Sequence, residues 1–336
     1  MSRRTTPSVV MVEQRAGRGA ARAARRRAER EGRRGVETIH RAVGLAPTPL
    51  RREAAVAHRS FGRNRRPGWV TYLILAVVIL VSAYPLYFAV QLASSTAADI
   101  ARNPIPPFLL QGHLGDNIRR VLNSDIDFWA AFVNSVIVST IVSVSVVFFS
   151  TLAGYSFSKL RFRGREGLLT FVIATMAVPA QLGVVPLFIV MAKLDWTGEL
   201  VSVIVPGMVS AFGVFWMTQY IRDALPYELI EAARVDGASM FRTFWSVALP
   251  AARPAAAMLA LFTFVGSWTN FFWPFIVLGA KNPTLPVALQ LLQASYFKDY
   301  SLIMAGVVVA TVPLLLLFVL AGRHLVSGIM QGAVKG

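Results

Sequence analysis

The sequence predicts an all-α membrane protein with six transmembrane helices. Hydrophobic residues make up 55% of the 336-residue chain, a larger share than an ordinary soluble protein holds. Six apolar stretches, each near the ~20 residues that a bilayer requires, follow one another, and none contains Asp, Glu, Lys or Arg. The chain has no cysteine, which excludes disulfides, thiolate metal sites and cysteine nucleophiles.

A basic segment precedes the first apolar stretch. Residues 1–68 hold eighteen of the 34 Lys and Arg residues and five acidic residues, and they show no sustained apolar face. We interpret this segment as a disordered cytoplasmic tail, with residues 69–336 forming the membrane domain. The tail is interpreted as a solvated extension that helps set orientation, and no nucleic-acid partner is expected. Attraction to anionic lipid and binding of nucleic acid are the alternative roles.

Basic residues in the connections between the apolar stretches predict the sidedness of the domain. They are more numerous in the tail and after the second and fourth spans than in the opposite connections. The positive-inside rule therefore places both termini and the 222–254 loop in the cytoplasm. In the long external connection, residues 114–128 are expected to form a helix on the membrane surface. The six spans are placed at residues 69–92, 129–157, 168–192, 200–221, 255–280 and 302–322.

Two short amphipathic helices are predicted within the 222–254 loop. Pro226 can open the first helix, and Gly237 is placed to end it in a left-handed conformation. Ser239 can cap the second helix, which Pro250 is expected to end.

The same loop carries a motif of fixed spacing. Glu231-Ala232-Ala233, then Gly237, then Val247-Ala248-Leu249-Pro250 resembles the EAA loop of binding-protein-dependent ABC importer permeases. This resemblance implies the type I importer permease fold, in which the loop forms a coupling helix that docks into a cleft of a cytoplasmic ATPase. The residues it assigns to ATPase coupling are Glu231, Ala232, Ala233, Asp236, Gly237, Leu249 and Pro250.

Two other interpretations of the helix pair are less consistent with the sequence. A helix-turn-helix DNA reader needs a positive field, but residues 222–253 carry four basic and four acidic residues. A membrane-surface anchor does not require a Glu and a Gly at fixed offsets.

The fifth span carries polar and helix-bending residues. Asn270 in hydrocarbon needs a partner, so it is expected either to face a water-filled path or to join neighbouring helices. Pro274 is expected to kink the span toward a cavity. The pattern around Trp268 and Asn270 resembles the fifth helix of carbohydrate-type permeases. Gln181, beside Pro179, is a further candidate for the translocation path.

Further stretches extend the resemblance over residues 69–336: AGYSFSKLRFRGR, VPAQLGVVPLFIV, PTLPVALQLLQ and GAVKG. They are similar to the carbohydrate subgroup, and within it to the smaller permease of the maltose type. The resemblance implies a bacterial inner-membrane complex with a second permease, two ATPase subunits, an extracellular solute-binding protein and a sugar substrate.

The sequence lacks the motifs of an enzyme. It contains no P-loop, no H-E-x-x-H and no G-x-S-x-G, and its four histidines show no metal-ligand spacing. We therefore expect no cofactor in this chain, with ATP and Mg²⁺ bound by the partner ATPase. The alternatives are an ion-coupled secondary transporter or channel, and a membrane-tethered nucleic-acid-binding protein.

Overall fold

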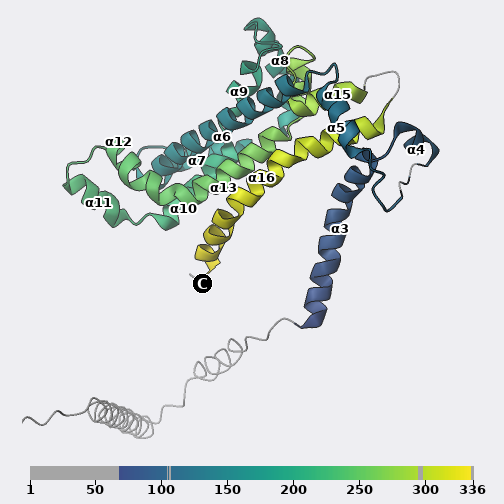
Figure 1. Cartoon of the computed structure of the whole chain (residues 1–336). Helices are drawn as coiled ribbons and strands as arrows, with labels where there is room; N and C mark the ends of the chain where they lie inside the picture. The colour runs from purple at the N-terminus through teal and green to yellow at the C-terminus, as the bar shows by residue number, and fades with distance from the viewer. Residues whose placement is uncertain (1–67, 104, 106, 294–297, 334–336) are drawn as a thin grey trace, which may run out of the picture. The chain divides into compact units, whose positions relative to one another are not determined.

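The computed structural model describes residues 68–103, 105, 107–293 and 298–333, with side chains described up to residue 320 (Figure 1). The predicted disordered tail, up to residue 67, lies outside the described residues. Contacts divide the chain into two units, residues 1–77 and 78–336, and the helical bundle belongs to the second unit.

Every regular element among the described residues is a helix, which confirms the predicted all-α class. The elements are α3 (Trp69–Ala93), α4 (Ala97–Arg102), α5 (Leu114–Leu122), α6 (Phe128–Lys159), α7 (Arg165–Thr175), η1 (Ala180–Gly183), α8 (Val184–Lys193), α9 (Val201–Gly207), α10 (Ala211–Ala224), α11 (Tyr227–Val235), α12 (Met240–Thr243), the π-helical turn η2 (Phe244–Ala248), α13 (Leu249–Trp268), α14 (Phe272–Leu278), α15 (Leu285–Gln293) and α16 (Tyr300–Ala333).

Within the described part of the chain, five helical segments are long and apolar enough to cross a membrane, and a sixth is counted if one bent pair forms a single span. That pair lies where the span at 168–192 was predicted: α7 and the η1–α8 segment meet at 88°. The bend follows from Pro179, which immediately precedes η1 and has no N–H to continue the hydrogen bonding of α7. The predicted span at 168–192 thus consists of two helical segments that meet at a sharp bend.

The centre of the bundle is α6, which packs against α10 and α13 (Figure 1). Small residues recur along its buried face, so neighbouring backbones approach closely. At Gly154 an added Cβ would lie only 2.8 Å from the backbone carbonyl carbon of Met217 in α10. The buried small residues of α6 are Ala131, Ser135, Ser139, Ser143, Ser150, Thr151, Gly154 and Ser158.

A second core joins α5, α15 and α16. The helix predicted at 114–128 ends at Leu122, and α6 begins at Phe128. It is also held by protein contacts: Val121 is fully buried, and the buried Asn117 Nδ2 donates hydrogen bonds of 2.9 Å to the carbonyls of Ala93 and Ser95. The helix therefore packs against the protein, and its position at the membrane surface stays a prediction.

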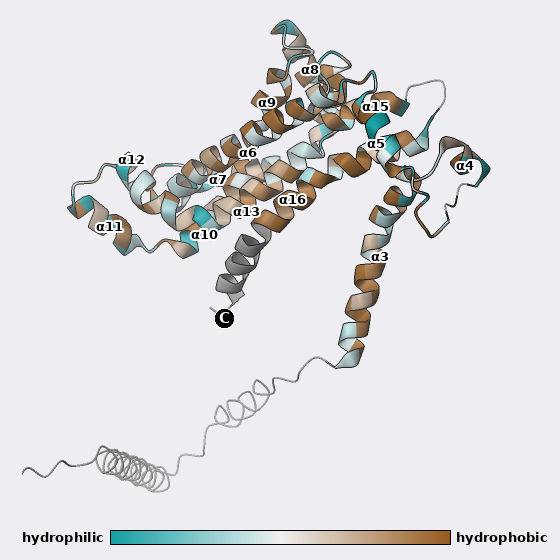
Figure 2. Ribbon diagram, viewed as in Figure 1, coloured by the Kyte–Doolittle hydropathy of each residue, from teal (hydrophilic) through white to brown (hydrophobic). Residues whose placement is uncertain are grey.

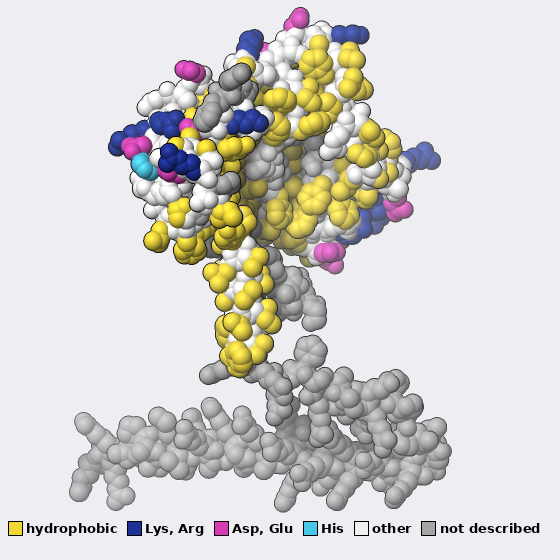
Figure 3. Space-filling view, turned by 90° about the vertical axis from the view of Figure 1, so that its right-hand side faces the viewer, with side chains coloured by type: hydrophobic (Ala, Val, Ile, Leu, Met, Phe, Trp, Pro, Cys, Tyr) yellow, Lys and Arg dark blue, Asp and Glu magenta, His cyan; other side chains and the backbone are white. Residues whose placement is uncertain are grey.

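The surface of the bundle suits a hydrocarbon environment. Figure 2 shows mainly hydrophobic residues along α6 and α16, with hydrophilic residues on α5 and near α11 and α12. Hydrophobic side chains cover broad areas of the face in Figure 3, whereas charged side chains lie toward its margins. Val144 and Phe171 are 64% and 68% exposed, as expected for residues that face lipid or a partner subunit.

Two prolines act differently from their predicted roles. The second helix of the 222–254 loop does not end at Pro250, because η2 continues it into α13 through a bond from the Leu249 N–H to the Phe244 carbonyl. Pro250 is the second residue of α13, which directly follows the π-helical turn η2, so the interruption of regular hydrogen bonding lies in η2 and the helix continues. Pro274 lies in the first turn of α14, where a missing N–H costs no helical hydrogen bond. The fifth span breaks earlier, between α13 and α14 at residues 269–271.

Candidate functional sites

The 222–254 loop forms a compact turn at one end of the bundle, opposite α15 (Figure 1). Pro226 was expected to be the first residue of the helix, but it immediately precedes α11, which begins at Tyr227. Gly237 follows the helix with φ of 76°. The Gly237 N–H donates to the Arg234 carbonyl at 3.0 Å, and the Ala238 N–H donates to the Ala233 carbonyl at 2.9 Å. These two bonds form a Schellman motif, which confirms the predicted left-handed end.

The second predicted cap is also confirmed. Ser239 precedes α12, and its Oγ accepts a hydrogen bond of 3.2 Å from the Arg242 N–H. Because both ends of the turn are satisfied locally, the tip keeps a defined shape while it projects from the bundle.

The structure divides the seven residues assigned to ATPase coupling into two groups. Ala233 is half-buried beside four exposed residues at the tip, whereas two half-buried residues lie in the first turn of α13. The tip is therefore accessible, whereas the two α13 residues are partly covered. The exposed tip residues are Glu231, Ala232, Asp236 and Gly237, and the partly covered residues of α13 are Leu249 and Pro250.

An apolar patch surrounds this turn. Val235, Met240 and Phe241 are 87%, 60% and 65% exposed, and they lie within five residues of Gly237 in the sequence. Val235 and Met240 were not predicted from the sequence as part of this surface, although both are large apolar residues beside the turn. Exposed apolar side chains next to the charged Arg234 and Arg242 are typical of a docking surface.

One cavity lies beside the break in the fifth span. It has a volume of about 340 Å³ and is bounded by α6, α9, α10 and α13. Asn270 lines it together with the hydroxyl-bearing Ser210, Thr263 and Ser267. The remaining lining residues are apolar or glycine: Val142, Val146, Val203, Gly207, Phe212, Leu259, Phe262 and Gly266.

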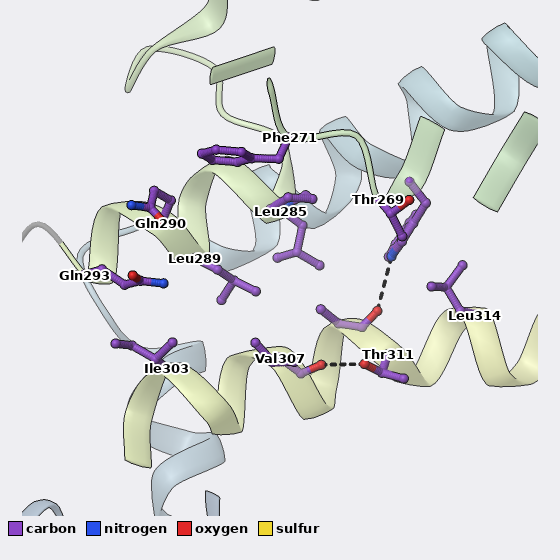
Figure 4. Close-up of a pocket in the computed structure, with 13 residues that line it drawn as sticks. Thr269, Phe271, Leu285, Leu289, Gln290, Gln293, Ile303, Val307, Thr311 and Leu314 are labelled. Carbon is purple, nitrogen blue, oxygen red and sulfur yellow. Dashed lines mark hydrogen bonds between the residues drawn. The ribbon is translucent and has the colours of Figure 1, made fainter. Parts of the chain in front are cut away.

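A second cavity of about 360 Å³ lies between the end of α13, α15 and α16 (Figure 4). Trp268 lines it and is only 3% exposed, and its Nε1 donates a 3.2 Å hydrogen bond to the Ala310 carbonyl. Gln290 and Gln293 reach it from α15, with Phe271 near Gln290. Trp268 thus joins α13 to α16 and does not line the same cavity as Asn270.

The other two candidates for the path line neither of these cavities. Gln181 is exposed in η1 at the bend of the third span, and Pro274 is buried in α14. Of the four residues, Asn270 alone lines the cavity between α6, α9, α10 and α13.

A family described as "Binding-protein-dependent transport system inner membrane component" matches residues 146–327, more than half of the chain. The chain belongs to this family. It is a multi-pass inner-membrane permease component of a transport system and not an enzyme. The resemblance predicted from the loop motif is thereby confirmed.

The chain aligns with other members of the permease family over nearly the whole length of those proteins. The arabinooligosaccharides transport system permease protein AraQ of Halalkalibacterium halodurans is 31% identical over 80% of this chain and 96% of that protein. The lactose transport system permease protein LacG of Rhizobium radiobacter is 31% identical over 81% of this chain and 98% of that protein. An sn-glycerol-3-phosphate transport system permease protein, UgpE of Brucella abortus, is 28% identical.

The fold of the permease is also found in a solved structure. A chain of a bacterial ABC transporter involved in the import of the acidic polysaccharide alginate superposes with a TM-score of 0.65 at 22% identity. The match covers 83% of this chain and 99% of the other. The fold class predicted from the sequence, an importer permease fold, agrees with this likeness.

Proposed function

We propose that this chain is one of two permease subunits of an ATP-driven importer for a sugar or a related polyhydroxylated solute. The named substrates of its relatives, an arabinooligosaccharide, lactose and sn-glycerol-3-phosphate, support this substrate class. In this proposal the second permease makes a heterodimer, two cytoplasmic ATPase subunits bind ATP and Mg²⁺, and an extracellular solute-binding protein delivers the substrate. Residues 69–336 form six spans with both termini in the cytoplasm.

The exposed tip of the 222–254 loop is the observation that carries the coupling role. Glu231, Ala232 and Gly237 project beside the apolar patch of Val235, Met240 and Phe241, on a turn whose own hydrogen bonds are complete. Such a surface can bind a cleft without refolding, so the ordering cost on docking is small. Closure of the ATPase dimer then moves α11 and alternates access to the path.

The cavity with Asn270 is proposed as this subunit's part of the path. Its walls combine one amide and three hydroxyl side chains with apolar surface. Hydroxyl and amide groups can exchange hydrogen bonds with a polyol as it passes. This chain lacks acidic or basic residues at the cavity, so an ion-coupled secondary transporter or channel is the less supported alternative.

Gly237→Asp tests the docking role. The variant is expected to insert normally and to lose nearly all uptake, because a side chain and a negative charge enter the docking surface. Uptake of radiolabelled solute and membrane abundance are measured together. Gly164→Asp is the matched control, since Gly164 also has a positive φ, of 80°, is also exposed and also has open space where a Cβ would stand.

Both variants place an aspartate in left-handed backbone, which costs about 1–2 kcal/mol. Gly164 precedes α7, where an aspartate can cap the helix, and only Gly237 lies at the proposed docking tip. Normal uptake by Gly237→Asp at normal abundance contradicts the coupling assignment, as does an equal loss in Gly164→Asp.

A further inference from the structure

The coupling loop is bonded to the end of α6. Lys159, the last residue of α6, is only 4% exposed, and its Nζ donates a 3.0 Å hydrogen bond to the Arg222 carbonyl at the end of α10. Tyr227, the first residue of α11, donates its hydroxyl to the Lys159 carbonyl at 2.7 Å. The Lys159 ammonium also lies 5.3 Å from the centroid of the Tyr227 ring. One residue of α6 thus contacts both sides of the entry to the coupling helix.

Aromatic packing adds to this junction. The Tyr155 ring in α6 lies 5.9 Å from the ring of Phe244, which follows α12, and both residues are buried. Ile230 of α11 is buried in the same core. A displacement of α11 or α12 therefore acts on the last turns of α6.

α6 is the uninterrupted helix among those that meet the loop. α10 is separated from α9 at residues 208–210, and α13 is separated from α14 at residues 269–271. α6 has 32 residues, which at 1.5 Å per residue gives a rod about 48 Å long. It can carry a movement along its axis with little loss, whereas the breaks in the other spans can absorb it.

The opposite end of α6 is bonded to the segment that begins α15. The Asn134 Nδ2 donates a 3.1 Å hydrogen bond to the Pro283 carbonyl, and the Ser135 Oγ accepts a buried 2.7 Å bond from the Leu285 N–H. Leu285 is the first residue of α15 and is fully buried. In Figure 1, α15 and the α11–α12 turn lie at opposite ends of the bundle.

We propose that α6 transmits the movement of the coupling loop to α15, with Lys159 and Tyr227 as positioning residues at one end and Asn134 and Ser135 at the other. This proposal rests on the proposed importer function. Through α15, which carries Gln290 and Gln293 into the cavity of Figure 4, ATPase movement reaches the opposite side of the membrane.

The test measures the number of solute molecules imported per ATP hydrolysed. The complex is purified from its native membrane, reconstituted in liposomes and supplied with its binding protein. Lys159→Met removes the hydrogen bond from the Lys159 ammonium, and Tyr227→Phe removes the hydrogen bond that positions Lys159. Each variant is expected to lower this ratio about tenfold. Their ATPase subunits should still co-purify in normal amount.

Two controls act on the same junction. Arg161 is exposed, and its guanidinium lies 6.0 Å from the centroid of the same Tyr227 ring, so Arg161→Met removes a nearby cation without breaking a bond to the Arg222 carbonyl. Lys159→Arg keeps a cationic donor and is the rescue variant. Both are expected to stay within about twofold of the wild-type ratio, since neither removes the charged hydrogen bond.

Asn134→Leu, at the far end of α6, distinguishes transmission from a local structural role. Transmission predicts the same fall in solute per ATP, although the change lies far from the ATPase. A normal ratio in Asn134→Leu or in Tyr227→Phe overturns the proposal, even if Lys159→Met fails to assemble. Failure of the importer function has a different signature, because the wild-type complex would then show no ATP-dependent uptake.

Discussion

Close contact between α6 and α10 makes Gly154 a sensitive position. In Gly154→Ala the new Cβ would lie 2.8 Å from the carbonyl carbon and the Cβ of Met217, and 2.9 Å from the Thr218 nitrogen. Carbon atoms normally stand about 3.5–4.0 Å apart, and backbone atoms cannot move aside without the whole of α10. Overpacking of this kind costs about 1–3 kcal/mol, against about 1 kcal/mol that alanine gains over glycine in a helix. We expect a net loss of up to about 2 kcal/mol.

Gly167→Ala is the control for this substitution. Gly167 lies in α7, is exposed and has nothing within 4 Å of the position of an added Cβ. This variant should gain about 0.5–1 kcal/mol from helix propensity alone. The assay is unfolding of the purified protein by a detergent titration, followed by tryptophan fluorescence. Equal stability of the two variants, or a more stable Gly154→Ala, refutes close packing of α6 on α10.

Two further predictions concern α16 and the path. Burial alone would raise the pKa of Asp299. Hydrogen bonds from the Ser301 hydroxyl, the Leu302 N–H and the Arg120 guanidinium outweigh this effect and hold the pKa below its usual value. The charged form therefore stabilises the fold above the usual carboxyl pKa of about 3.9, and this stability is lost as pH falls through the lower folded pKa. Asp299→Asn should flatten the decrease of unfolding stability with acid in this range, and an unchanged pH profile would count against the pairing. Asn270→Leu is expected to lower uptake about two- to tenfold, since a hydrogen bond lost to a polar substrate costs about 0.5–1.5 kcal/mol, while ATPase co-purification is unchanged; full uptake would remove Asn270 from the path.

Local chemistry explains which parts of the fold could be predicted from the sequence. Long apolar runs without charge predict spans, because only a helix satisfies its backbone inside a bilayer. The turn of the 222–254 loop was predictable as well: Gly237 and Ser239 each have a local conformational role that the structure confirms.

Prolines gave less certain information, because the effect of a proline depends on its distance from the start of a helix. Pro250 lies just after the π-helical turn η2 and Pro274 lies in the first turn of α14, so neither causes the expected stop or kink. The bend before Pro179 comes from the same chemistry at a helix end.

The cavities could not be predicted, since each combines segments distant in sequence. Trp268 and Asn270 are two residues apart, yet the end of α13 directs them into different cavities. The bonds that join Lys159 to Tyr227 connect residues 68 positions apart and had no local signal.

The measurement that tests the central claim most directly is purification of the tagged chain from its native membrane in mild detergent, with mass spectrometry of the proteins that accompany it. We expect a P-loop ATPase and a second, similar permease, with the ATPase lost in Glu231→Lys and the second permease retained. If the chain is recovered alone or only with copies of itself, and still transports solute without ATP, the importer assignment is wrong.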